Sequence, residues 1–66
     1  MNAIAKPALL DERQAAEVLG FTISTLRSRR YWKRPPKFVK MGRAVRYRRE
    51  DLESYIQSCV VQPREG

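Results

Sequence analysis

Histidine is absent from this 66-residue sequence, and cysteine occurs only once, as Cys59. A single cysteine excludes a disulfide within the chain, and a zinc site needs several Cys or His ligands that the sequence does not offer. No apolar run is long enough to cross a membrane, and residues 1–6 do not resemble a signal peptide. We therefore expect a soluble, intracellular protein that binds no metal, no cofactor and no membrane.

Acidic residues are missing from the middle of the chain. From Val18 to Arg49 there are eleven Lys or Arg residues and no Asp or Glu, whereas all seven acids lie outside this stretch. A solvated surface usually mixes both signs, and a stretch of one sign repels itself unless it meets a polyanion. With a net charge of +7, nucleic acid is the first candidate for that polyanion. A basic surface that only aids solubility is the plainer alternative.

The usual components of an enzyme are also missing. The sequence has no nucleophile with a base beside it, no metal-ligand cluster and no glycine-rich phosphate loop. A hydrophobic content of 42% in so short a chain supplies one modest core and no deep pocket. We expect neither catalysis nor a small-molecule substrate.

Two short helices are predicted in the first half of the chain. Asp11 followed by a glutamine three residues later has the spacing of a capping box, and Gly20 suits the end of a helix. These signals predict a helix over 12–19. Thr22 can cap a second helix over 23–30.

The apolar residues of these helices indicate which faces are buried. The first helix carries Ala15, Val18 and Leu19 on one face, and the second directs Ile23 and Leu26 toward the first. The intervening Gly-Phe-Thr has helix-turn-helix spacing. The other side of the second helix carries the polar residues Ser24, Thr25, Arg27, Ser28 and Arg30.

A β-hairpin is predicted after two prolines. The segments "KFVKM" and "AVRYR" are rich in β-branched and aromatic residues and flank a Gly-Arg pair. A period of two places Val45 and Tyr47 on one face and Arg46 and Arg48 on the other. One face can then pack on the helices while the other reaches phosphates. The register of the first strand stays open, because its three apolar residues cannot all face the same way.

A change of charge sign in "RRED" marks the start of a third helix. Glu50 and Asp51 suit the positive end of a helix dipole. Apolar residues then repeat with the period of an amphipathic helix, at Leu52, Tyr55, Ile56 and Cys59.

The predicted fold is mostly α with a small β-hairpin, a winged helix-turn-helix of order α-α-β-β-α. We divide the chain into an N-terminal arm over 1–8, a DNA-binding domain over 9–59 and a C-terminal tail over 60–66. Tyr47 and Tyr55 are expected in the core. Trp32 either covers the core beside the prolines or stands exposed as a protein contact.

One block of the sequence resembles a known family. "LLDERQAAEVLGFTISTL", the proline pair and "VKMGRAVRYRREDLESYI" resemble the small AlpA-type regulators and excisionases of phages and integrative elements, which have a MerR-like winged-helix fold. The resemblance covers roughly residues 9–57. The family's usual Gly-Arg, Val-Arg-Tyr, acid-Leu and aromatic positions are matched by Gly42, Arg43, Val45, Arg46, Tyr47, Asp51, Leu52 and Tyr55.

The resemblance implies a set of DNA contacts. The second helix would enter the major groove and read bases with Ser24, Thr25, Arg27 and Ser28, with Arg27 the best candidate for a guanine. Ser24 and Thr25 can equally be first-turn residues without a base contact, and Arg29 and Arg30 are as suited to phosphate as to base. The wing would place Arg43 in the adjacent minor groove, with phosphates held by Lys40, Arg46 and Arg48.

The resemblance also implies a biological role. Its members typically bind several adjacent sites on double-stranded DNA, bend it and assist an integrase in excision, so a location in the cytoplasm on a prokaryotic nucleoid is expected. We expect cooperative head-to-tail self-association on repeated sites, because a single module of this size covers little DNA. Two alternatives stay open: a small transcriptional regulator of the same element, and an RNA-binding or protein-interaction module using exposed aromatics.

Overall fold

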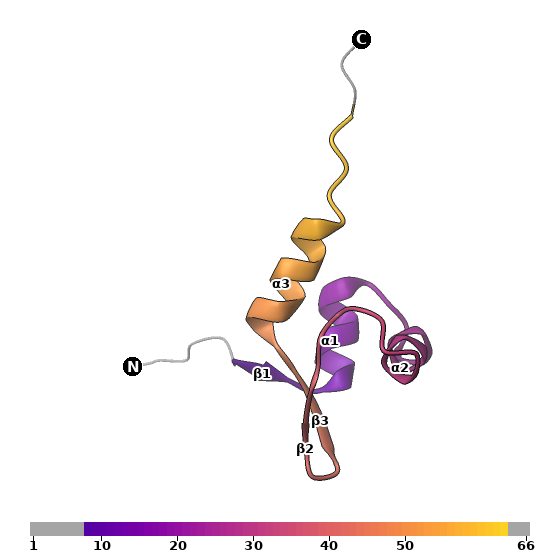
Figure 1. Cartoon of the computed structure of the whole chain (residues 1–66), viewed down its shortest axis with the longest axis vertical. Coiled ribbons are helices and arrows are strands. Elements are labelled where there is room, and N and C mark those ends of the chain that lie inside the picture. Colours follow the sequence, from indigo (N-terminus) through magenta and orange to yellow (C-terminus); the bar gives the residue numbers. More distant parts are fainter. Residues whose placement is uncertain (1–7, 64–66) are drawn as a thin grey trace.

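The computed structural model describes residues 8–63, which form three helices and a small antiparallel sheet (Figure 1). Residues 1–7 of the predicted arm and 64–66 of the predicted tail lie outside the described residues. The predicted winged helix-turn-helix architecture is confirmed. The order of elements in the described residues is β1 (Leu9–Leu10), α1 (Glu12–Leu19), α2 (Ile23–Tyr31), β2 (Val39–Met41), β3 (Ala44–Arg48) and α3 (Arg49–Ser58).

The predicted caps of α1 are both present. The side chain of Asp11 accepts a hydrogen bond from the backbone N–H of Gln14, and the Gln14 side chain accepts one from the N–H of Asp11. At the other end Gly20 has φ +72°, and the next N–H, that of Phe21, reaches back to the carbonyl of Ala16 at 2.9 Å. This left-handed ending turns the chain sharply, so that only three residues separate α1 from α2.

Helix α2 ends without a glycine. Thr22 caps its start as predicted, but the helix continues to Tyr31 and stops before the prolines. Lys33 takes φ +58°, while the N–H of Arg34 reaches the carbonyl of Arg29 at 2.8 Å, so the same left-handed ending recurs with a lysine. Sequence signals could not indicate this, because a non-glycine residue rarely adopts the conformation.

The hairpin of β2 and β3 has a two-residue turn, Gly42-Arg43. Of these two residues only Gly42 has a positive φ, +63°, which is the sign pattern of a type II′ turn. The register left open by the sequence is Val39 opposite Arg46 and Met41 opposite Ala44. The face shared by Val39, Met41 and Arg46 therefore points away from the face of Tyr47.

A third strand was not predicted. Leu9–Leu10 pairs antiparallel with β3, which makes the sheet order β1-β3-β2 with β3 in the centre. The pairing places Leu10 opposite Tyr47, and both are buried. A two-residue strand has too little sequence to show a period, and its partner lies almost forty positions away, so no local pattern could reveal it.

The core lies where α1, α2, α3 and the sheet meet. Its fully buried apolar residues are Leu10, Ala15, Ala16, Leu26, Tyr47 and Leu52. Figure 1 shows α1 at the centre of this arrangement, between α2 and α3. Ile23 and Phe38 are partly buried against the core, and Phe38 lies against Tyr47 with ring centroids 6.4 Å apart.

Three residues expected on buried helix faces are exposed. Val18 is 42% exposed because the inward stripe of α1 consists of residues 12, 15, 16 and 19 rather than 15, 18 and 19. In α3, Leu52 is buried but Ile56 is 40% exposed and Cys59 is also exposed. The second half of α3 extends beyond the sheet (Figure 1). Of its apolar stripe, Tyr55 stays half-buried there while Ile56 and Cys59 face solvent.

Candidate nucleic-acid interface

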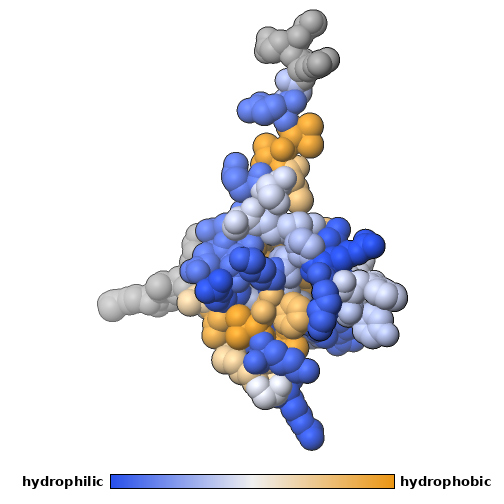
Figure 2. Space-filling view, in the orientation of Figure 1, coloured by the Kyte–Doolittle hydropathy of each residue, from blue (hydrophilic) through white to orange (hydrophobic). Residues whose placement is uncertain are grey.

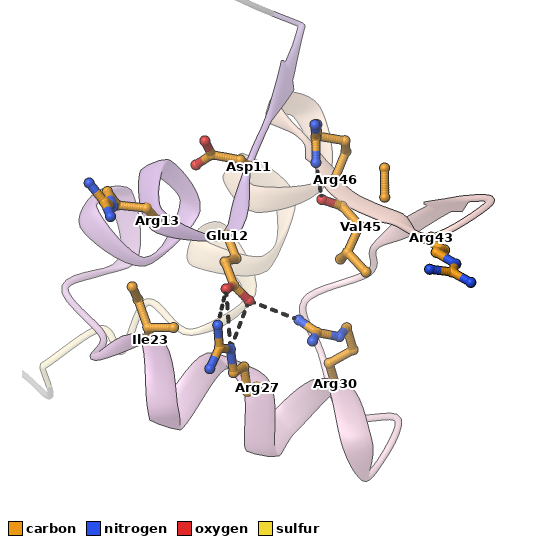
Figure 3. Close-up of a pocket in the computed structure, with 10 residues that line it drawn as sticks. Asp11, Glu12, Arg13, Ile23, Arg27, Arg30, Arg43, Val45 and Arg46 are labelled. Carbon is orange, nitrogen blue, oxygen red and sulfur yellow. Dashed lines mark hydrogen bonds and ion pairs between the residues drawn. The ribbon is translucent and has the colours of Figure 1, made fainter.

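A broad concave surface separates the helix-turn-helix unit from the hairpin. It encloses about 690 Å³ between the start of α1, one side of α2 and the tip of the β2–β3 hairpin (Figure 3). Five of its ten lining residues are arginines. The lining residues are Asp11, Glu12, Arg13, Ile23, Arg27, Arg30, Arg43, Ala44, Val45 and Arg46. The concavity therefore has the positive character that a phosphate backbone requires.

Glu12 lies at the centre of the polar contacts in this concavity. Arg27 binds the Glu12 carboxylate through the Nε–Nη2 edge of its guanidinium. Nε lies 3.1 Å from Oε1 and 3.2 Å from Oε2, and Nη2 lies 2.6 Å from Oε2. Arg30 approaches the same carboxylate from one turn further along α2, with Nη1 3.4 Å from Oε1. Figure 3 shows both guanidinium groups turned toward Glu12. Helix periodicity explains the meeting, because residues 23, 26, 27 and 30 share one stripe of α2.

The electrostatics of this cluster follow from the contacts. The hydrogen bond from Arg27 is the main cause that lowers the pKa of Glu12, and the charges of Arg27 and Arg30 act in the same direction against some desolvation. The pKa of Arg27 is raised, chiefly by its hydrogen bond to Glu12. One carboxylate and two guanidinium groups leave the cluster with a net positive charge.

Arg30 is placed differently from the other predicted residues of the second helix. Its side chain is only 24% exposed, and its Nη1 also lies 3.4 Å from the hydroxyl oxygen of Tyr47 in β3. The structure therefore sets Arg30 behind Arg27, between α1 and the sheet. Arg27 in contrast is 61% exposed despite its ion pair.

The three hydroxyl residues predicted to read bases lie on the exposed side of α2. Ser24, Thr25 and Ser28 are all exposed. The hydroxyl of Thr25 accepts a hydrogen bond from Thr22 at 3.0 Å, as part of the cap. Within residues 8–63 the hydroxyls of Ser24 and Ser28 have no hydrogen-bond partner, so both are available to a ligand.

The cationic side chains of the hairpin differ in their exposure and in their contacts within the protein. Arg43 is exposed in the turn and, among the described residues, has no ion pair or hydrogen bond. Lys40 is also exposed, but pairs across the hairpin with Val45 and so faces the opposite way from Arg46. Arg46 is half-buried and donates from Nη1 to the carbonyl of Val45 at 2.8 Å.

Arg48 is held at the start of α3. Its Nε and Nη2 donate to the carboxylate of Asp51 at 2.7 and 2.9 Å, and its Nη1 lies 3.2 Å from Glu50. The hydrogen bond from Arg48 is the main cause that lowers the pKa of Asp51. The predicted placement of both acids in the first turn of α3 is confirmed, and together they tie the end of β3 to the helix that follows.

Sequence reasoning missed two residues of the concavity, Glu12 and Arg13. Glu12 occupies the inward stripe of α1 formed with Ala15, Ala16 and Leu19. An acid on an otherwise apolar stripe, opposite two arginines on the stripe of the next helix, was the available signal. Arg13 lines the rim and is exposed.

Arg29 serves the fold on the other side of α2. Its guanidinium lies 5.4 Å from the ring centroid of Phe21 and 5.7 Å from that of Tyr55, and it donates to the carbonyl of Pro35 at 2.9 Å. These contacts connect α2, α3 and the proline loop. Arg29 is therefore engaged in packing, which neither of its sequence interpretations anticipated.

Tyr31 and Trp32 lie at the end of α2, 75% and 66% exposed. Their rings meet edge to face with centroids 5.0 Å apart. Of the two alternatives for Trp32, the structure favours the exposed one. Exposed apolar residues also occur beyond α3, at Val60 and Val61, where Figure 2 shows a hydrophobic group standing clear of the domain.

Two further findings concern the described residues alone. Within residues 8–63 no group of three or more His, Cys, Asp or Glu could hold a metal ion. None of the helices in that range is sufficiently long and apolar to span a bilayer.

Comparison with known proteins assigns the chain to a family. A family model described as a helix-turn-helix domain matches residues 9–60, which is most of the chain. The match includes α1, α2, the hairpin and α3. No curated protein matches the chain at a significant level.

Proposed function

The chain belongs to the helix-turn-helix domain family that matches residues 9–60, and on this premise we propose that it is a sequence-specific DNA-binding excisionase. In this role it binds repeated sites near an attachment site, bends the DNA and assists an integrase. The observation that carries the proposal is the arginine-lined concavity between α2 and the hairpin.

The exposed side of α2 fits the major groove, which is wide enough to admit one helix. Ser24, Thr25 and Ser28 are exposed there and can donate to base edges. Arg27 is the guanine reader, since its side chain is 61% exposed. Arg30 supports it from behind rather than reaching the bases, because it is mostly buried between Glu12 and Tyr47.

The hairpin serves as the wing. Arg43 projects from the turn without a partner among the described residues, and the hydrophilic atoms at the hairpin tip extend furthest from the body at the bottom of Figure 2. A free arginine at such a tip suits a narrow minor groove, where the negative potential of A·T tracts is enhanced.

Three further cations are proposed as phosphate contacts. Lys40 and Arg46 lie on opposite faces of the hairpin, so they would contact the two sides of one groove rather than one strand. Arg48 would contact a phosphate by exchanging part of its contacts with Asp51 and Glu50. Such contacts fix the register of a protein on DNA without reading sequence.

The excision role rests on the resemblance and on size. One module of 66 residues buries little surface on DNA, so specific occupancy gains from adjacent copies bound head to tail. Transcriptional regulation by the same contacts is the alternative, because a bend or an occupied promoter requires no different residues. The exposed Tyr31–Trp32 pair is the observation that would favour an RNA-binding or protein-interaction module.

Footprinting on DNA around the protein's own gene, including any attachment site, tests the proposal. Protection of several evenly spaced repeats beside a recombination core is expected for an excisionase. Protection limited to one promoter would assign the role of a transcriptional regulator. Preferential binding of single-stranded RNA would assign the role of an RNA-binding module. Arg43→Ala should weaken this protection, because it removes the wing arginine. Arg34→Ala is the matched control, since Arg34 is equally charged but lies outside the concavity.

A further inference from the structure

Glu12 presents a physical problem for a surface that binds DNA. It puts a carboxylate, with a lowered pKa, into the concavity proposed to face the phosphate backbone. A negative charge there opposes DNA binding over distances of about one Debye length. The geometry of its ion pairs indicates what the residue contributes in return.

The way in which Arg27 binds Glu12 leaves half of the guanidinium free. A guanidinium has five N–H donors in a planar fork. Glu12 occupies the Nε–H and one N–H of Nη2, which is the side edge of the fork. The Nη1 group and the second N–H of Nη2 form the end edge. Since the side chain is 61% exposed, this end edge is open to solvent.

An end edge with two parallel N–H groups is what a guanine requires. Arginine binds guanine most specifically by donating to O6 and N7 at the same time. An arginine that already has its side edge bound to a carboxylate loses less conformational freedom when the end edge docks, because the torsions of the side chain are set beforehand. The same charge on a mobile side chain would attract any phosphate instead.

The network behind Glu12 fixes the carboxylate as well. Arg30 donates to Glu12 from the buried side and lies beside the Tyr47 hydroxyl, and Tyr47 is part of the core. Glu12 itself is the first residue of α1 and lies within the Asp11–Gln14 capping box. Contacts from α1 and β3 therefore help to fix the Arg27 side chain, which does not depend on α2 alone.

From this geometry we propose that Glu12 is a positioning residue that makes Arg27 a selective reader of guanine, at some expense of overall DNA affinity. The inference rests on the proposed function, since it requires α2 to enter the major groove. It predicts that removal of the carboxylate separates specificity from affinity. Selectivity at one base pair falls, while binding to unrelated DNA becomes tighter.

The test is a selection from a randomised duplex library with the full chain and two matched variants. Glu12→Gln removes the carboxylate charge but keeps the shape. Glu17→Gln is the control, because Glu17 is on the same helix, is exposed and has no ion pair within residues 8–63. Circular dichroism establishes that each variant is folded before binding is compared.

The wild-type chain should enrich a site with one guanine favoured about 5- to 150-fold, the range of a bidentate arginine contact. Glu12→Gln should lose most of that preference and keep the preferences at the other positions. Glu17→Gln should keep all of them. Both variants should bind an unrelated duplex more tightly than the wild type, since each removes a negative charge.

Three results would overturn the inference, and they differ from one another. Retention of the guanine preference by Glu12→Gln would remove Glu12 from recognition but leave the proposed function intact. Loss of preference at every position by a folded Glu12→Gln would show that Glu12 supports the whole interface and does not position Arg27 in particular. If the wild-type chain enriches no site, the proposed function fails together with the inference.

A second measurement does not depend on the variant folding. In the wild-type chain, NMR can follow the exchange of the Arg27 Nε–H proton with water, before and after the selected duplex is added. Slow exchange in both states is expected, because the side edge stays bound to Glu12. Fast exchange in the complex would mean that Arg27 leaves Glu12 to bind DNA, which contradicts a positioning role.

Discussion

The arginines of α2 and the arginine of the wing illustrate two uses of the same side chain. Arg27 is bound to Glu12 through two of its nitrogens, and Arg30 is enclosed behind it. Arg43 in the hairpin turn has no such partner among the described residues. A guanidinium held in place can select one base, whereas a free one can follow a groove of variable width. Both arginines have the same charge, so in the proposed account it is the neighbouring carboxylate that distinguishes a base-reading arginine from one that only anchors the protein.

The substitution with the largest expected effect on specific DNA binding is Arg27→Lys. It keeps the charge but replaces the planar fork by a point charge that cannot donate to O6 and N7 in the same plane. We expect specific affinity to fall about 5- to 150-fold, with little change on unrelated DNA. Fluorescence anisotropy on the selected and an unrelated duplex measures both. Equal losses on both duplexes would show that Arg27 is an anchor.

Arg43→Ala tests the free member of the comparison. We expect weaker binding on all sequences, a loss of preference for A·T pairs beside the main site, and a reduction of about 0.9 in the slope of log K against log salt. Arg34→Ala, measured in parallel, should leave the A·T preference unchanged. An unchanged affinity and footprint for Arg43→Ala would exclude the wing from the interface.

The left-handed residue that follows α1 is Gly20, whereas the one that follows α2 is Lys33. Gly20→Ala should destabilise the fold by about 1–2 kcal/mol, because an alanine there is strained by its backbone conformation alone. The added Cβ would meet no atom within 4 Å, so packing does not contribute. Lys33→Gly should instead stabilise the fold, by about 1 kcal/mol or less. The gain is smaller because glycine also loses more backbone entropy on folding. Urea unfolding with a common m value measures both.

Acidification should affect the paired arginines through their partners and leave the free one unchanged. The folded-state pKa values of Glu12 and Asp51 are lowered, so their ion pairs contribute stability that is fully present above the ordinary pKa values and is lost as pH falls through the folded ones. We expect a small effect, since the pairs are partly solvated. Thermal melting from about pH 6 to pH 3 should show a smaller loss of stability in Glu12→Gln than in the wild type. A parallel decline of both would mean that the pair stabilises nothing.

Local signals predicted most of the fold. Asp11, Thr22 and Gly20 each act within a few residues along the chain, so the bounds of α1 and the start of α2 followed from the sequence. The strand Leu9–Leu10 and the left-handed Lys33 could not be predicted in this way. The strand depends on a distant partner, and the lysine adopts a conformation that its residue type disfavours.

The candidate site was predicted as a set of cationic and hydroxyl side chains, and the structure adds how they are arranged. Ser24, Thr25 and Ser28 are exposed on α2 as expected. The placement of Arg27 and Arg30 depends on how α1 and α2 cross, which no local pattern encodes. Glu12 was overlooked because an acid in the first turn of a helix is ordinarily explained by the helix dipole.

Methylation interference with dimethyl sulfate on the enriched duplex tests the central claim most directly. The reagent modifies guanine at N7 in the major groove and adenine at N3 in the minor groove, so one experiment reports on α2 and the wing together. We predict interference at a guanine N7, flanked by interference at adenine N3 positions that disappears in Arg43→Ala. Binding that tolerates both modifications would contradict the claim that α2 reads the major groove with the hairpin as its wing.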